Sequence, residues 1–162
     1  MKRLLVLGAA AAVAVVVVAV NATAGHKPDH GKGRDHRGGK TLTVVERATT
    51  DAVTNGDAAH DVAGNILTFA NDVYDRTNTT KVGTDQGSCT RIVVGKSWEC
   101  MWTTFLPGGQ ITVEGPFYDN ARDSTLAITG GTGAYRNVRG QMDLKYRNPA
   151  GTEFDFVFHV IG

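Results

Sequence analysis

The sequence is poor in the residue patterns from which most recognisable active sites are built. It has only two cysteines and five histidines, and it contains no Gly-x-Ser-x-Gly, His-Glu-x-x-His or Cys-x-x-Cys segment. These absences remove the signatures of a hydrolase nucleophile elbow, a zinc peptidase and a dithiol redox centre. Lysine and arginine number 17 against 16 acidic residues, so the basic excess of a nucleic-acid-binding protein is also missing. We therefore expect no metal site, no cofactor and no nucleic-acid partner.

A long apolar run occurs only at the N-terminus. Lys2 and Arg3 precede the seventeen apolar residues 4–20, and Ala22-Thr23-Ala24 follows as a small-x-small cleavage pattern. This order predicts a secretory signal peptide over residues 1–24. A membrane anchor is the alternative, because the run approaches spanning length. With the peptide removed, 17 − 2 = 15 basic and 16 acidic residues remain, and we expect a secreted protein that does not associate with membranes.

Residues 25–40 lack large apolar side chains and consist mainly of Gly, Lys, Arg, His and Asp. Such a segment cannot bury enough surface to offset the entropy of ordering, so we expect a disordered arm. The remaining 122 residues, 41–162, have the length of one ordinary domain.

Helical periodicity is scarce in that domain, whereas alternation of apolar and polar residues recurs about every dozen residues. The candidate strands lie near residues 41–48, 65–75, 81–94, 97–105, 109–117, 123–129, 137–147 and 152–161. Pro107-Gly108-Gly109 is a hairpin signal. We interpret the Gly-Gly-Thr-Gly segment at 130–133 as a turn between two strands, because glycine accepts backbone angles that a Cβ forbids. Evenly spaced strands with glycine-rich turns predict an all-β sandwich or barrel.

The two cysteines, Cys89 and Cys100, are placed symmetrically about Val94-Gly95. In a hairpin that turns there, they would face each other on neighbouring strands, within reach of a disulfide after slight adjustment. Two cysteines in an exported chain favour the bond. Closing so short a loop should stabilise the fold by roughly 2–3 kcal/mol.

Two polar residues interrupt apolar faces of the predicted strands. Because side chains alternate along a strand, Glu46 shares a face with Val44, and Asn71 shares one with Phe69 and Val73. A carboxylate facing an apolar interior needs a partner or its pKa rises, and a buried unpaired amide costs about 1–3 kcal/mol. Such groups are either satisfied locally or poised for a ligand, and the sequence leaves both possibilities open.

Residues 110–144 resemble the barrel of the plant allene oxide cyclases, and the Gly-Gly-Thr-Gly…Arg-Gly element within them resembles the related dirigent proteins. Segments 64–74, 82–89 and 153–158 fit the same pattern in the same order. The resemblance covers about Leu42 to the C-terminus. It implies a closed, eight-stranded, antiparallel up-and-down β-barrel of the calycin type rather than a sandwich, and a homotrimer. It also offers an alternative for Cys89, because the matching cysteine of the plant enzymes is a free thiol facing the cavity.

The same resemblance implies roles for the two polar residues. Glu46 and Asn71 fall on a glutamate and an asparagine that line the substrate cavity of the plant cyclases, and Phe117 falls on a tyrosine. Ala48 stands where those enzymes have a second, water-holding asparagine, so their water network is at most half preserved. We take Glu46 and Asn71 as candidate catalytic residues. The candidate ligand-binding aromatic residues, most of which are also ordinary core positions, are Phe69, Trp102, Phe117, Tyr146 and Phe156.

Three functions fit this sequence. The first is a cofactor-independent isomerase or cyclase acting on a small hydrophobic molecule held in the lumen, with a dirigent-like, stereochemistry-directing role as a variant. The second is a non-catalytic extracellular carrier of a lipophilic ligand. The third is a structural barrel filled by its own aromatic side chains. A cavity of roughly 300 Å³ or more would favour the first two.

Overall fold

A computed structural model describes residues 39–54 and 60–161. The predicted signal peptide and nearly all of the predicted arm lie outside the described residues. In the part of the chain that is described, no helix is long and apolar enough to cross a membrane.

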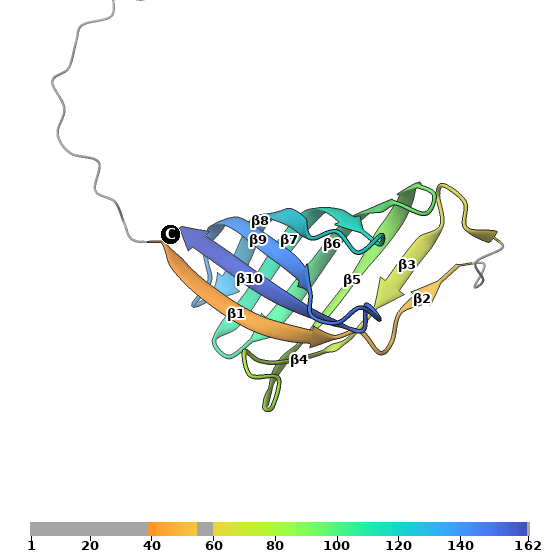
Figure 1. Ribbon diagram of the computed structural model, residues 1–162. Coiled ribbons are helices and arrows are strands. Elements are labelled where there is room, and N and C mark those ends of the chain that lie inside the picture. The colour runs from red at the N-terminus through yellow and green to blue at the C-terminus, as the bar shows by residue number, and fades with distance from the viewer. Residues whose placement is uncertain (1–38, 55–59, 162) are drawn as a thin grey trace, which may run out of the picture. The chain divides into compact units, whose positions relative to one another are not determined.

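Every regular element bounded within the described residues is a β-strand (Figure 1). The strands are β1 (Lys40–Arg47), β2 (Ala52–Val53), β3 (Ile66–Phe69), β4 (Asp72–Asp75), β5 (Lys81–Val93), β6 (Ser97–Leu106), β7 (Gly109–Tyr118), β8 (Ser124–Gly133), β9 (Arg139–Tyr146) and β10 (Glu153–Ile161).

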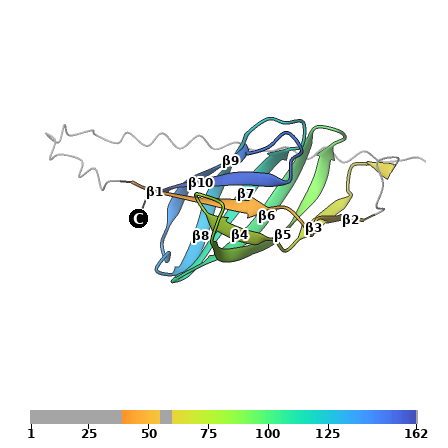
Figure 2. The same ribbon diagram turned by 60° about the horizontal axis from the view of Figure 1, so that its bottom comes forward.

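The strands close into an antiparallel barrel, visible from two sides in Figures 1 and 2. From β5 to β10 each strand pairs with the next, β10 pairs with β1, and β1 pairs with β4, which returns to β5. β3 and β4 follow each other along β5 and are interrupted at Ala70 and Asn71, so together they supply one barrel strand. The short β2 pairs with β3 outside this circuit. The eight-stranded barrel expected from the sequence is confirmed, and the sandwich is excluded.

The predicted alternation also places the core correctly. Inward residues of the strands are buried, and aromatic rings run through the lumen: the Trp102 centroid lies 6.0 Å from that of Phe69 and 5.5 Å from that of Phe156. Phe158 continues the series with its centroid 6.4 Å from that of Phe156. The lumen is therefore packed with side chains over much of its length, as expected for a barrel of this strand number.

The turn predicted at 130–133 is wrong. These residues continue β8 and pair with the beginning of β7, and the chain turns only at 134–137. The glycines serve close backbone approach instead: a Cβ on Gly131 would lie 2.5 Å from the carbonyl oxygen of Tyr135. Gly133 adopts a φ of 60° and would collide with the Gly108 carbonyl if it carried a side chain. The glycine run thus allows the strand to pass unusually close to the neighbouring turns.

The disulfide predicted between Cys89 and Cys100 is confirmed. The two residues are direct cross-strand partners in β5 and β6, with Cα atoms 4.0 Å apart. Both are buried in the lumen wall, and no thiol is left on Cys89, in contrast to the alternative drawn from the plant enzymes.

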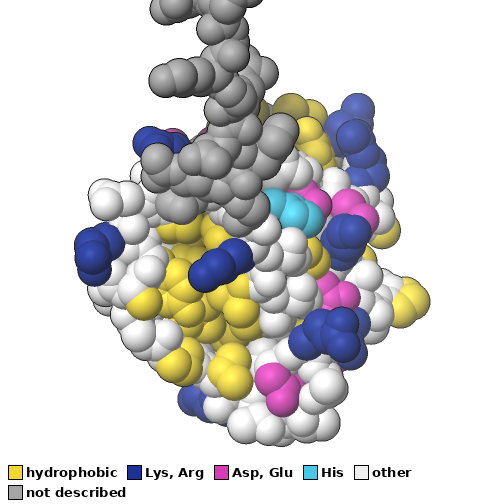
Figure 3. Space-filling model, turned by 90° about the vertical axis from the view of Figure 1, so that its left-hand side faces the viewer, with side chains coloured by type: hydrophobic (Ala, Val, Ile, Leu, Met, Phe, Trp, Pro, Cys, Tyr) yellow, Lys and Arg dark blue, Asp and Glu magenta, His cyan; other side chains and the backbone are white. Residues whose placement is uncertain are grey.

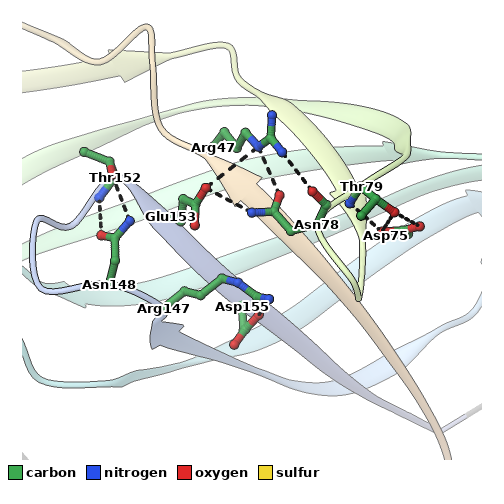
Figure 4. A network of polar contacts seen from close by, with 9 residues as sticks. All are labelled: Arg47, Asp75, Asn78, Thr79, Arg147, Asn148, Thr152, Glu153 and Asp155. Carbon is green, nitrogen blue, oxygen red and sulfur yellow. Dashed lines mark hydrogen bonds and ion pairs between the residues drawn. The ribbon is translucent and has the colours of Figure 1, made fainter.

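A polar network on the outer surface ties the end of β1 to its neighbours (Figure 4). The Arg47 guanidinium lies 3.7 Å from the ring centroid of Tyr74 and donates to the Oδ1 and carbonyl oxygens of Asn78. Asn78 in turn donates to Glu153 at the start of β10. Because Arg47 is held outward, the preceding residue, Glu46, is directed into the barrel.

Candidate functional site

A small cavity lies in the lumen beside the end of β1. It is lined mainly by apolar and aromatic side chains, with Glu46 in its wall and the exposed Asp51 also among its lining residues. Its volume is about 40 Å³, which by the usual criterion is room for two or three water molecules at about 15 Å³ each. The lining residues are Glu46, Asp51, Leu67, Phe69, Cys89, Cys100, Trp102, Phe117, Leu144, Phe154 and Phe156.

Two buried carboxyl groups meet at the side of this cavity. Glu46 on β1 is 6% exposed and Asp85 on β5 is 1% exposed, and the two carboxyl groups lie close enough for each to affect the pKa of the other. Two neighbouring buried carboxylates disfavour each other's charge, so their burial favours a proton on one of them.

Burial decides the protonation of this pair. Burial, followed by the nearby charge of Asp85, raises the pKa of Glu46 well above its ordinary value. Burial likewise raises the pKa of Asp85 to about 7, although the backbone N–H of Asn71 and the Glu46 carboxyl group both act against that rise. Burial thus raises the pKa of both carboxyl groups, and that of Asp85 lies near neutral pH.

Asn71 holds the pair in place. Its Nδ2 donates to Glu46 Oε1 at 2.9 Å and to Asp51 Oδ1 at 3.1 Å. Its Oδ1 accepts from the backbone N–H groups of Thr49 and Thr50 and from the Thr50 hydroxyl at 2.9–3.0 Å. Both amide hydrogens are thus engaged, and Asn71 is not among the residues that line the cavity. Direct contact with a ligand would first require one of these bonds to be exchanged.

Most of the candidate aromatic residues line the cavity. Phe69, Trp102, Phe117 and Phe156 contribute to its wall, whereas Tyr146 does not. The Tyr146 ring stacks 6.3 Å from the ring of Phe117, and its hydroxyl donates to the Tyr118 carbonyl at 2.8 Å. Tyr146 thus supports the cavity wall from behind.

Asp85 is the main residue that the sequence reasoning missed. The segment around it is polar, so it shows no apolar alternation from which to assign a face. Cys89 supplies the missing signal: if it faces Cys100 inside the barrel, residues two and four positions earlier on the same strand face inward too. Asp51, which lies in the loop after β1, belongs to no strand pattern and could not have been placed in this way.

Three inward polar atoms have no hydrogen-bond partner among the described residues. They are Asp85 Oδ2, Thr104 Oγ1 and Trp102 Nε1. Asp85 on β5 and Thr104 on β6 are direct cross-strand partners, and the next pair along these strands is Gln86 and Thr103. Buried polar groups are rarely left unpaired, so this stretch of the lumen offers acceptor and donor capacity to a small polar group. Within residues 39–54 and 60–161, no set of three His, Cys, Asp or Glu side chains is grouped to hold a metal ion.

Comparison with known proteins identifies the family. The sequence profile of the family described as allene oxide cyclase matches residues 42–154, and the chain belongs to this family. The solved structures that it resembles include a pyocyanin demethylase (22% identity, TM-score 0.59, 74% of this chain and 100% of that one). Another is AbnU, an exo-specific intermolecular Diels–Alderase (17%, 0.61, 77% and 99%). A third is a pterocarpan synthase dirigent protein (17%, 0.60, 83% and 97%). At these identities the structural likeness shows the shared barrel.

Proposed function

We propose that this protein is a secreted barrel enzyme that isomerises or cyclises a small, unsaturated hydrophobic molecule, with the reacting part of that molecule placed against Glu46. The observation that carries the proposal is the buried Glu46 in the wall of an aromatic cavity, with the buried Asp85 beside it. Carboxyl groups whose pKa values are raised by burial are suited to general acid–base catalysis. In its ionised form, a carboxylate here would also stabilise positive charge that develops on a delocalised ligand.

The neighbouring residues have distinct roles in this proposal. Asn71 is a positioning residue, because both of its side-chain amide hydrogens are donated to Glu46 and Asp51. Phe69, Trp102, Phe117 and Phe156 are the walls that fold the substrate into a reactive conformation. No organic cofactor or metal has a step in this chemistry.

The family and its structural relatives support the reaction class. The matched family is named for a cyclase, and one similar structure is of a Diels–Alderase. Both names describe the closure of rings. The disulfide and the predicted signal peptide support secretion. A homotrimer remains a prediction from the family resemblance.

The small cavity favours a second candidate, the structural barrel. A volume of about 40 Å³ is far below the roughly 300 Å³ of a typical small-molecule site. For this protein to act as an enzyme, the half-buried Phe69 and Phe117 would have to rotate so that the lumen admits more of the substrate than its reacting group. A measurement of ligand binding therefore tests the structural-barrel alternative before any turnover is measured.

The experiment incubates the full chain with a lipid epoxide and, separately, with a conjugated polyene, and follows products by chiral chromatography. We expect product with the native chain and a loss of at least about 100-fold in rate with Glu46→Gln, as for removal of a general acid–base group. Asn71→Ala should also lower the rate, because Glu46 loses the hydrogen bond that positions it. Glu99→Gln, an exposed glutamate on β6, is the matched control and should leave the rate unchanged.

Two other outcomes of this experiment would favour the alternative functions. Binding measured by calorimetry without product, in native and variant chains alike, would favour the carrier. Neither binding nor product would leave the structural barrel as the function.

A further inference from the structure

The barrel has a second, larger recess at the end opposite to Glu46. Two strands run from one site to the other. On β1, Glu46 lines the lumen cavity and Leu42 lines the recess. On β10, Phe154 lines the cavity and Val160 lines the recess. The recess lies between the start of β1 and the β8–β9 turn, and its volume is about 490 Å³. An adjoining hollow of about 300 Å³ shares Leu42 and Tyr135 with it. Both hollows reach the size of a typical small-molecule site.

The floor of this recess is apolar. Viewed onto this end, hydrophobic side chains gather at the centre of the face, with lysine and arginine side chains beside them (Figure 3). The apolar residues that floor the recess and the adjoining hollow pack against the core, and all of them except the buried Val138 are only partly buried. They are Leu42, Val82, Leu106, Tyr135, Val138 and Val160.

The rim of the recess is cationic. Lys40 and Arg136 line it, both are exposed, and the recess has no acidic residue in its lining. Neither cation makes an ion pair with another described residue. The adjoining hollow contains Arg76 and one acid, Asp75. Hydrogen bonds from the Thr79 backbone and the Thr77 hydroxyl lower the pKa of Asp75 to about 2, so it stays ionised and would repel an anion on that side.

We propose that this end of the barrel binds a single-chain anionic amphiphile. The tail lies on the floor formed by Leu42, Val138 and Val160, and the headgroup lies between Lys40 and Arg136, on the side away from Asp75. An apolar floor next to unpaired cations fits this chemistry better than it fits a neutral lipid or a cationic peptide. The site is separate from the lumen cavity and does not depend on the proposed catalytic function.

The chain's own N-terminal segment is a poor occupant by composition. Residues 25–38, which precede the recess in sequence, contain no large apolar side chain and carry several lysine and arginine residues. They could neither cover the floor nor complement the cationic rim. A second copy of this chain is a further alternative, which the experiment distinguishes.

The test titrates the full chain with decanoate, decanol and decyltrimethylammonium by calorimetry, below their micelle concentrations, and maps the contacts by methyl NMR. We expect decanoate to bind about fivefold or more tightly than decanol, as one exposed ion pair allows, and the cationic amphiphile to bind most weakly. Methyl signals of Leu42, Val138 and Val160 should shift, and those of Leu67 and Leu144 in the lumen wall should not.

Charge variants separate the rim from general electrostatics. Lys40→Glu with Arg136→Glu should weaken decanoate binding at least about tenfold and leave decanol binding unchanged. Lys96→Glu with Lys145→Glu changes the net charge equally at exposed positions away from the recess and should have little effect. Glu46→Gln should also have none, which keeps this result independent of the proposed enzyme.

Three results would overturn the proposal. One is equal affinity for decanoate and decanol. Another is equal weakening by both pairs of charge variants. The last is a native chain that sediments as an oligomer while the Lys40→Glu, Arg136→Glu chain sediments as a monomer, which would make this end an interface between copies.

Discussion

The two ends of the barrel differ in how their polar groups are buried and paired. Near Glu46, the side chains of Glu46, Asn71 and Asp85 are buried and linked by hydrogen bonds from Asn71, and Glu46 lines a cavity of about 40 Å³. Near Lys40, the cations Lys40 and Arg136 are exposed and form no ion pair within the part of the chain that is described, and they border an apolar recess of about 490 Å³. A buried network gains strength and definition from its low-dielectric surroundings, whereas an exposed rim stays adaptable and contributes little to stability. The first arrangement suits chemistry on a small group, and the second suits recognition of a larger one.

The largest effect should come from removing the hub of the buried network. Asn71→Ala deletes five hydrogen bonds and leaves Glu46 Oε1 and two backbone N–H groups without the partner that Asn71 provides. We expect the free energy of unfolding to fall by about 3–5 kcal/mol, measured by guanidinium denaturation. A loss under about 1 kcal/mol would mean that water replaces these bonds and that the network is not a buried one.

Opening the disulfide should have the next largest effect. Cys89→Ser with Cys100→Ser releases a loop closed across 11 positions, and we expect stability to fall by roughly 2–3 kcal/mol. The lumen cavity lies against this bond, so any ligand of the Glu46 end should also bind more weakly. Decanoate binding at the Lys40 end should persist, and its parallel loss would show that the two ends are not independent.

The pH dependence of stability should come mainly from the Glu46 end. Both carboxyl groups have folded-state pKa values above their unfolded values, near 7 for Asp85. Stability is then fully present below about pH 4, the unfolded range, and is lost as the pH rises toward 7. We expect a loss of about 1–2 kcal/mol between about pH 5 and 7, seen in denaturation at each pH. Asp85→Asn, which keeps an acceptor for the Asn71 N–H, should flatten this slope, and an unchanged slope would assign it to other groups.

The smallest effect should follow changes at the cationic rim. Lys40→Gln with Arg136→Gln alters two exposed residues that form no ion pair with another described residue, and we expect stability to change by less than about 0.5 kcal/mol. Thermal unfolding of the native and variant chains provides the measurement. A large loss would show that these cations hold the β8–β9 turn rather than a ligand.

Sequence reasoning succeeded where the cause of structure is local. Alternation placed nearly every strand within one or two residues and assigned Glu46 and Asn71 to the buried face. It failed at 130–133, because the same glycine that permits a turn also permits close packing of extended backbone. Only the neighbouring strands distinguish the two uses.

By itself, the sequence determined the strands, their inner and outer faces and the Cys89–Cys100 bond, because strand periodicity and hairpin symmetry act between near neighbours in the chain. Its family resemblance chose a barrel over a sandwich. The tertiary structure alone decided that Glu46 meets Asp85, that Asn71 is fully occupied, and that the larger hollow lies at the Lys40 end. Those features depend on which strands become adjacent when the sheet closes and on the space their side chains leave unfilled, and neither is encoded in any one segment.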